Sequence, residues 1–264
     1  MYLYLKNTSS GSPISEEVDK DIADELKRLH IAAPIKTFTS EAELSQILSG
    51  IDKLATNTIA IIGSDSDFET LIGQIGQVPH DVAIGYIPTG ASNIGHKLLI
   101  KSWKSGIEAL AQRKINEVTI YSLGNRYFFD NITLSFEPNT AIAKPIGLSV
   151  DASLDLRLPD CTLEFENISD NQYLIKKPIQ LRASSSVAQD PKSKKDLLAG
   201  LIKRISIKAP TSSRVIASLH GKVFKVQAIG QITDNYGRIY KNSVTIGKST
   251  KKIRLISRKI NQTD

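Results

Sequence analysis

Apolar runs alternate with amphipathic stretches along the first hundred residues. The run Ile59-Ala60-Ile61-Ile62 is short and wholly apolar, as expected for a strand buried on both faces, and Gly63 ends it. Residues 59–76 and 82–100 share one order, a buried strand, a loop of small residues and an amphipathic helix. Two further strands are predicted at Tyr2–Leu5 and Ile35–Thr39, and further helices at Ser12–Leu29, Ser40–Ile51 and Ser102–Lys114.

The helix starts carry capping signals. Ser12 is a good N-cap with Pro13 at the first helical position, and Ser40 with Glu43 has the spacing of a capping box. Because strands and helices that alternate in this way form a mostly parallel sheet with helices on both faces, we predict a Rossmann-like α/β half.

From Glu117 onward the apolar period falls to two. Val118–Tyr121 and Tyr127–Phe129 flank Gly124-Asn125, a pair typical of a hairpin turn. One helix is predicted at Ser193–Ile205. The other predicted strands are Asn131–Phe136, Ile146–Val150, Ser153–Leu158, Thr162–Glu166, Tyr173–Ile175, Ile179–Ala183, Ile205–Lys208, Arg214–Leu219, Val223–Ile229, Tyr240–Ile246 and Lys252–Ile256.

The length of 264 residues suits one large domain or two small ones. We expect an α/β nucleotide-binding-like domain over 1–120 and a β-sandwich domain over 121–264, with the boundary near 115–130. The last strands or the tail could return to the first domain. The fold class is therefore α/β followed by β.

Composition places the chain among globular proteins, with 41% hydrophobic and 23% charged residues. Cys161 is the only cysteine, so an internal disulfide is excluded, and a reducing cytoplasmic compartment is favoured. No apolar run reaches the length of about 18 residues that a membrane span needs. The four histidines are scattered without the spacing of a zinc site.

A net charge of +7 favours anionic partners, which could be a nucleotide, a nucleic acid or a membrane surface. A solvated basic face is the plain alternative. Basic residues alternate with apolar ones near the end of the chain, which indicates a strand with a charged face.

The loop after Ile62 is a candidate phosphate site. A loop that leaves the carboxyl end of a parallel strand and enters a helix presents unpaired N–H groups and the positive end of the helix dipole. The plain alternative is that Gly63 only allows a turn and that Asp65 and Asp67 cap the following helix.

Three motifs occur in order: Asn7-Thr8-Ser9-Ser10-Gly11, Gly63-Ser64-Asp65-Ser66-Asp67 and Pro88-Thr89-Gly90-Ala91-Ser92-Asn93. In this order they resemble the diacylglycerol kinase catalytic domain, a family that includes bacterial lipid kinases and is related to NAD kinases. They correspond to the family motifs N-P-x-S-G, G-G-D-G-T and P-x-G-T-x-N-D. The resemblance extends over essentially the whole chain.

The resemblance implies ATP- and Mg²⁺-dependent phosphoryl transfer to a lipid hydroxyl at a membrane surface, with ATP between the two domains. The protein would then be cytoplasmic and peripheral at the inner membrane face. Asp65 would order Mg²⁺ or the acceptor hydroxyl, and Asp234 is a weaker catalytic candidate. The implied cofactor-binding residues are Asn7, Ser10, Gly11, Thr39, Gly63, Ser64, Asp65, Ser66, Gly90 and Asn93.

Departures from the motifs support a second hypothesis. Two glycines of G-G-D-G are Ser64 and Ser66, and the threonine that follows them is Asp67. The family's late D-G-E motif is matched at best by Asp234 to Arg238, where the glutamate is missing. An arginine cannot accept a proton from a lipid hydroxyl at neutral pH.

Metal-binding carboxylates of the family are also missing from 184–195, which looks shortened. The alternative is a catalytically inactive relative that binds nucleotide or lipid as a sensor or interaction module. A basic nucleic-acid binder is a third and less favoured class.

Overall fold

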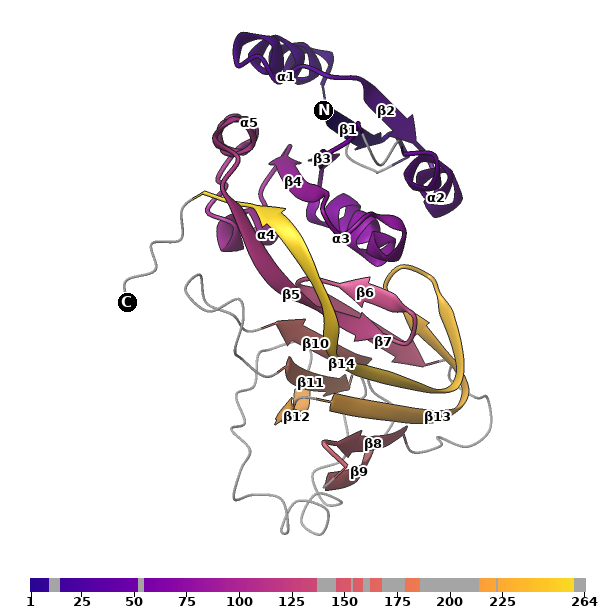
Figure 1. Ribbon diagram of the computed structural model, residues 1–264. Helices are drawn as coiled ribbons and strands as arrows, with labels where there is room; N and C mark the ends of the chain where they lie inside the picture. Colours follow the sequence, from indigo (N-terminus) through magenta and orange to yellow (C-terminus); the bar gives the residue numbers. More distant parts are fainter. Residues whose placement is uncertain are drawn as a thin grey trace.

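Five neighbouring strands form the parallel part of the sheet (Figure 1). The computed structural model describes residues 1–9, 15–51, 55–136, 146–152, 154–158, 162–167, 179–185, 214–221 and 223–258. The parallel strands lie in the order β2 (Ile35–Phe38), β1 (Tyr2–Asn7), β3 (Thr58–Gly63), β4 (Ala83–Pro88) and the end of β14 (Ile239–Ile256). The apolar runs of β3 and β4 are buried along their whole length, as the sequence predicts.

Helices cover both faces of these strands. Figure 1 shows α1 (Glu16–Arg28) and α5 (Trp103–Gln112) on one side, with α2 (Glu41–Ser49) and α3 (Asp65–Gly73) on the other. The short helices η1 (Ile75–Gln77) and α4 (Asn93–Lys97) follow α3 and β4. The predicted Rossmann-like arrangement is therefore present.

Helix caps differ in detail from the predictions. The N-cap of α1 is Ser15, and the predicted cap Ser12 lies outside the described residues. Ser40 caps α2 by accepting a hydrogen bond from the Glu43 N–H. The Glu43 side chain does not close the capping box, because its Oε2 accepts from the Thr39 N–H at 2.6 Å instead.

Antiparallel strands follow the α/β half. The β5–β6 hairpin turns at Gly124-Asn125 as predicted. The two last predicted strands, at 240–246 and 252–256, are one continuous strand, β14, with an irregularity between Lys248 and Lys252. The remaining strands are β5 (Ile115–Leu123), β6 (Arg126–Phe128), β7 (Asn131–Phe136), β8 (Ile146–Val150), β9 (Leu154–Leu158), β10 (Thr162–Asn167), β11 (Ile179–Ser185), β12 (Arg214–Gly221) and β13 (Val223–Asp234).

Strand β14 joins the two kinds of sheet. It pairs antiparallel with β13 and β5, and its residues 254–255 pair parallel with β4. Two apolar clusters lie along it, one under the parallel strands and one within the antiparallel strands. Leu255 belongs to the first cluster and Ile246 to the second. The predicted helix at 193–205 and the predicted strands at 173–175 and 205–208 lie outside the described residues.

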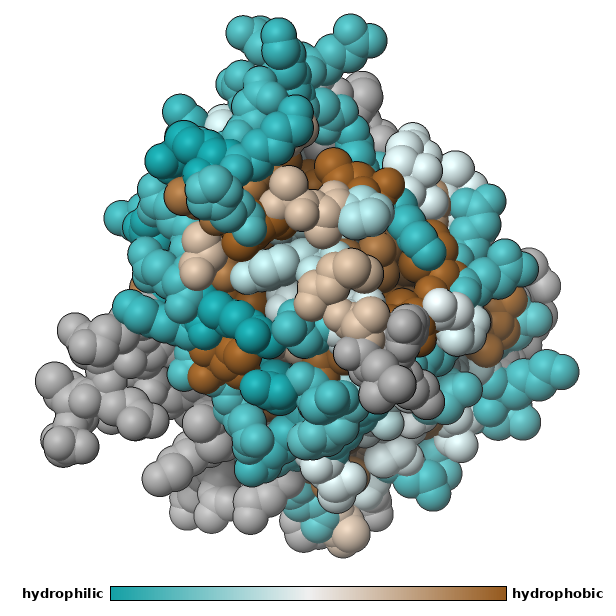
Figure 2. Space-filling model, turned by 45° about the horizontal axis from the view of Figure 1, so that its top comes forward, coloured by the Kyte–Doolittle hydropathy of each residue, from teal (hydrophilic) through white to brown (hydrophobic). Residues whose placement is uncertain are grey.

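The surface is mostly hydrophilic on the face that Figure 2 shows, with apolar residues mainly in its central part. Large apolar side chains that are exposed in the described residues come from separate elements: Met1, Ile35, Leu154, Val223 and Ile239. None of the helices in the described ranges has the length and apolar character that crossing a membrane requires.

Helix α5 lies unusually close to β4. A Cβ atom added to Gly106 would lie 2.7 Å from the Tyr86 carbonyl oxygen and 3.1 Å from the Ile87 Cα. Both are backbone atoms, which cannot rotate away, so this glycine sets the distance between helix and strand.

We expect Gly106→Ala to lower the free energy of unfolding by about 1–3 kcal/mol, because overpacking against backbone exceeds the gain in helix propensity. Urea denaturation followed by circular dichroism measures this. The matched control is Gly76→Ala, whose added Cβ would meet the Tyr127 ring at an ordinary 3.8 Å. Equal stability of the two variants would contradict the close approach.

A buried carboxylate attaches α3 to the antiparallel half. Glu69 is 3% exposed, and its oxygens accept hydrogen bonds from the backbone N–H groups of Phe129 at 2.9 Å and Asp130 at 2.5 Å. Burial raises the pKa of Glu69 to about 8, although these two N–H donors act in the opposite direction. The neighbouring Asp130 forms an ion pair with Lys97.

Stability should therefore fall as pH rises from about 5 to about 8, because the native state retains a proton on Glu69 that the unfolded chain has released. The slope attributable to this group approaches about 1.4 kcal/mol per pH unit. Glu69→Gln removes the titrating group, so this pH dependence should be absent from the variant. The stability that wild type loses relative to the variant at about pH 8 should therefore be regained as the pH falls towards about 5. Parallel pH profiles for the two proteins would show that Glu69 is ionised in the native state.

Candidate functional site

The loops that follow β1, β3 and β4 meet at the carboxyl edge of the parallel sheet. The Thr89 N–H donates to the Gly63 carbonyl at 3.1 Å, and Asn7 Nδ2 donates to Asp67 Oδ1 at 2.8 Å. The fold therefore brings together the described residues of all three motifs. Ser10 and Gly11 lie outside the described residues.

Asp67 fills the loop after β3 with its own carboxylate. Ser64 caps α3, and Asp67 Oδ2 accepts from both the Ser64 N–H and the Ser64 hydroxyl at 2.8 Å, which completes a capping box. Asp67 is 2% exposed, and a Cβ added to Gly63 would collide with its carboxylate. The space beside Gly63, where the loop could cradle a phosphate, thus holds an internal anion.

Asp65 is held by donors from the third motif. Its Oδ2 accepts from the backbone N–H groups of Asn93 at 2.7 Å and Ile94 at 3.2 Å. Its Oδ1 accepts from the Tyr86 hydroxyl at 2.9 Å and from the Ser92 hydroxyl. Burial raises the pKa of Tyr86 above its ordinary value, so this phenol stays a neutral donor.

These contacts bear on whether Mg²⁺ fits. A carboxylate offers about four lone-pair positions, and the four donors to Asp65 occupy them. Asp67 accepts three hydrogen bonds. Within the described ranges, no group of three or more His, Cys, Asp or Glu side chains is placed to hold a metal ion. In this arrangement the loop does not fit the Mg²⁺-bound triphosphate that the sequence suggests.

The other predicted residues surround this loop. Ser66, Gly90 and Asn93 are exposed, and a Cβ added to Gly90 would meet nothing within 4 Å. Thr39 lies beside the first motif, because the Ser9 hydroxyl donates to its carbonyl at 2.8 Å. The Thr39 hydroxyl donates to Glu43 at 2.9 Å. A role of Ser66, Gly90, Asn93 and Thr39 in binding a cofactor stays a prediction.

Asp234 is the last residue of β13, just before the turn that leads to β14. Its Oδ1 accepts from the N–H groups of Tyr236 at 2.9 Å and Arg238 at 3.0 Å, and its Oδ2 accepts from the Tyr240 hydroxyl at 2.9 Å. These bonds shape the turn. A catalytic role for Asp234 stays a prediction, and its carboxylate has this structural task already.

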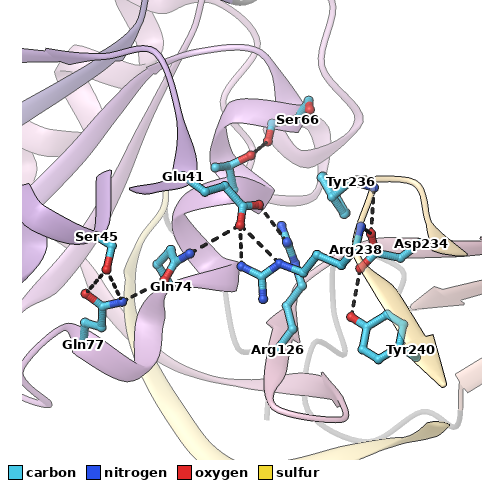
Figure 3. Close-up of polar contacts among 11 residues, drawn as sticks. Glu41, Ser45, Ser66, Gln74, Gln77, Arg126, Asp234, Tyr236, Arg238 and Tyr240 are labelled. Carbon is cyan, nitrogen blue, oxygen red and sulfur yellow. Dashed lines mark hydrogen bonds and ion pairs between the residues drawn. The ribbon is translucent and has the colours of Figure 1, made fainter. Parts of the chain in front are cut away.

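Sequence reasoning missed a cluster of charged residues between the two halves (Figure 3). Glu41 at the start of α2 receives hydrogen bonds from Arg126 of β6 and from Arg238 in the turn before β14. One signal was available, because Arg126 and Phe128 share a face in a strand with period two. Phe128 is an expected core residue, so Arg126 should be buried too, and it is 1% exposed.

Comparisons with known proteins bear on the family and the fold. The sequence profile of the diacylglycerol kinase catalytic domain matches residues 1–123. A diacylglycerol kinase from Bacillus anthracis str. Sterne has a similar structure, with a TM-score of 0.66, 8% sequence identity and coverage of 97% of this chain and 96% of that chain. An NAD kinase from Archaeoglobus fulgidus in complex with ATP gives a TM-score of 0.56, 14% identity and coverage of 97% and 94%. No curated protein matches.

At these identities the structural matches establish the fold, an α/β half with a parallel sheet followed by antiparallel strands. The sequence match covers residues 1–123 of the 264. Residues 1–123 therefore match the diacylglycerol kinase catalytic domain, within a chain that has the diacylglycerol kinase and NAD kinase-like fold.

Proposed function

We propose that this protein is a binding member of its family, which takes a phosphate-bearing ligand, a nucleotide or a phospholipid head group, without transferring a phosphoryl group. One observation carries the absence of transfer: the Asp67 carboxylate accepts from the Ser64 N–H and fills the space beside Gly63. A second negative group brought there would meet like charge in a partly desolvated site. The family's fold supports ligand binding between the two halves.

The late motif supports the same conclusion. Arg238 stands where the family's glutamate is expected, and its guanidinium is paired with Glu41. A guanidinium stays protonated at neutral pH, so it cannot act as a general base towards a hydroxyl. If the ligand is a lipid, the protein would act in the cytoplasm at the inner face of the membrane, where its net charge of +7 favours anionic lipids.

A divergent lipid kinase is the second candidate, with ATP-dependent transfer to a lipid hydroxyl. It is favoured by Asp65 and Asn93, which keep the family's residue types and lie in direct contact, with the Asn93 N–H donating to Asp65 Oδ2 at 2.7 Å. In that case Asp65 would have to exchange its present donors for Mg²⁺-bound water or the acceptor hydroxyl.

Two assays on one purified protein separate these functions. With Mg²⁺, labelled ATP and diacylglycerol-containing vesicles, we expect no labelled lipid above an Asp65→Asn control. Thermal unfolding should nevertheless shift upward with ATP or with phosphatidic acid vesicles, since a ligand at about 100 times Kd stabilises the native state by about 2.7 kcal/mol. Labelled lipid that disappears in Asp65→Asn would establish the kinase, and the absence of both transfer and stabilisation would refute both candidates.

A variant of the loop tests whether the Asp67 carboxylate weakens ATP binding. Asp67→Thr restores the family's residue and removes the internal anion from the site beside Gly63. We expect this variant to bind ATP more tightly than wild type by about tenfold, the effect of removing one close like charge. Ser49→Thr on α2, at an exposed position, is the control that should leave affinity unchanged. Weaker ATP binding by Asp67→Thr would mean that Asp67 contributes to the ligand site.

A further inference from the structure

The charged cluster between the two halves has more hydrogen-bond donors than its carboxylate uses. Four donor contacts converge on Glu41: Arg126 Nη1 on Oε1 at 2.8 Å, and Arg238 Nε at 3.2 Å, Arg238 Nη2 and Gln74 Nε2 at 3.4 Å on Oε2. Figure 3 shows both guanidinium groups directed at this one carboxylate. The donors come from α3's end, from β6 and from the β13–β14 turn, so the cluster spans the seam between the halves.

Arg126 is buried and has hydrogen-bond donors that no described residue accepts. It is 1% exposed, and its Nε and Nη2 have no hydrogen-bond partner in the part of the chain that the structure describes. Such donors cost free energy unless an acceptor meets them. A Cβ added to Gly73 would lie 2.9 Å from Cζ, Nε and Nη2 alike, and the Tyr236 ring centroid lies 4.1 Å from Cζ. Gly73 and the Tyr236 ring therefore pack closely against the guanidinium.

The cluster also opens to solvent. Arg238 and Glu41 have side-chain exposures of 30% and 31%. Burial alone would raise the pKa of Glu41, but hydrogen bonds from Arg238 and Arg126 hold this pKa below its ordinary value. The Glu41 carboxylate is therefore an anion at neutral pH. Two other carboxylates lie near the cluster: Asp234, which accepts from the turn N–H groups and the Tyr240 hydroxyl, and Glu69, which interacts electrostatically with Arg126.

We infer that Arg126, Arg238 and Gln74 form an anion site in which the Glu41 carboxylate is the internal occupant, and that the phosphate group of a phosphomonoester takes its place. Two arginine forks match the several oxygens of a phosphate better than the two oxygens of one carboxylate. Displacement of Glu41 would release the start of α2 from the antiparallel half. This inference rests on the proposed binding function and names the group that recognises the ligand's phosphate.

Substitutions of the occupant and of one donor test the site in opposite directions. Glu41→Gln keeps the shape of the side chain but removes the competing charge, and we expect it to bind inorganic phosphate at least about tenfold more tightly than wild type in isothermal titration calorimetry. Arg238→Gln should bind it at least about tenfold more weakly. If Arg238→Gln does not fold, Arg238→Lys, which keeps the charge without the fork, should still weaken binding several-fold.

The matched controls are Glu25→Gln and Arg28→Gln, which break an exposed two-bond ion pair on α1. Both should bind phosphate as wild type does. ATP without Mg²⁺, and phosphatidylcholine vesicles with and without phosphatidic acid, distinguish a nucleotide from a lipid as the source of the phosphate.

The outcomes separate this site from the proposed function. If wild type binds a probe with an affinity that neither Glu41→Gln nor Arg238→Gln changes, the assignment of this site is wrong and the binding function stands. If neither wild type nor Glu41→Gln binds any of the probes, the binding function and the site both fail.

Discussion

The hydrogen bonds between Asp67 and Ser64 determine what the carboxyl edge of the parallel sheet can do. A loop between a buried strand and a helix would present free N–H groups to an anion. Here Asp67, in the first helical turn, accepts from the Ser64 N–H and lies against Gly63. The same carboxylate accepts from Asn7, so it also fixes the end of β1. The carboxyl edge is thereby held together by charges that belong to the protein.

The second carboxylate of the loop extends this arrangement to the third motif. Asp65 receives the first N–H groups of α4 and two hydroxyl groups, so it ties the loop after β3 to the loop after β4. Together the two aspartates satisfy the donors that would otherwise select a triphosphate. We therefore infer that ligand recognition falls to the seam between the halves, where Arg126 and Arg238 offer more hydrogen-bond donors than the Glu41 carboxylate accepts.

Much of the fold followed from the sequence. Wholly apolar runs marked β3 and β4, helical stripes marked α1, α2 and α5, and Gly124-Asn125 marked the β5–β6 hairpin. The continuity of β14 did not follow, because polar residues between 246 and 252 interrupt its apolar alternation while the backbone pairing continues on both sides. The division into two domains stays a prediction.

The site was predicted in part. The order of three motifs brought Asn7, Gly63 and Asn93 to one edge, because the carboxyl ends of parallel strands share an edge. The partners of Asp65 and Asp67 could not be predicted, since they depend on side chains of Tyr86, Ser92 and Asn7 that meet only in the fold. Glu41 and Arg238, which lie 197 residues apart, form a pair for the same reason.

A crystal structure of the protein soaked with Mg²⁺ and ATP tests the central claim most directly. If the loop is closed by its own anion, Asp67 keeps its hydrogen bonds to Ser64, and no triphosphate lies over Gly63 to Ser66. A metal-bound triphosphate over these residues, with the Asp67 carboxylate turned away from Ser64, would contradict it.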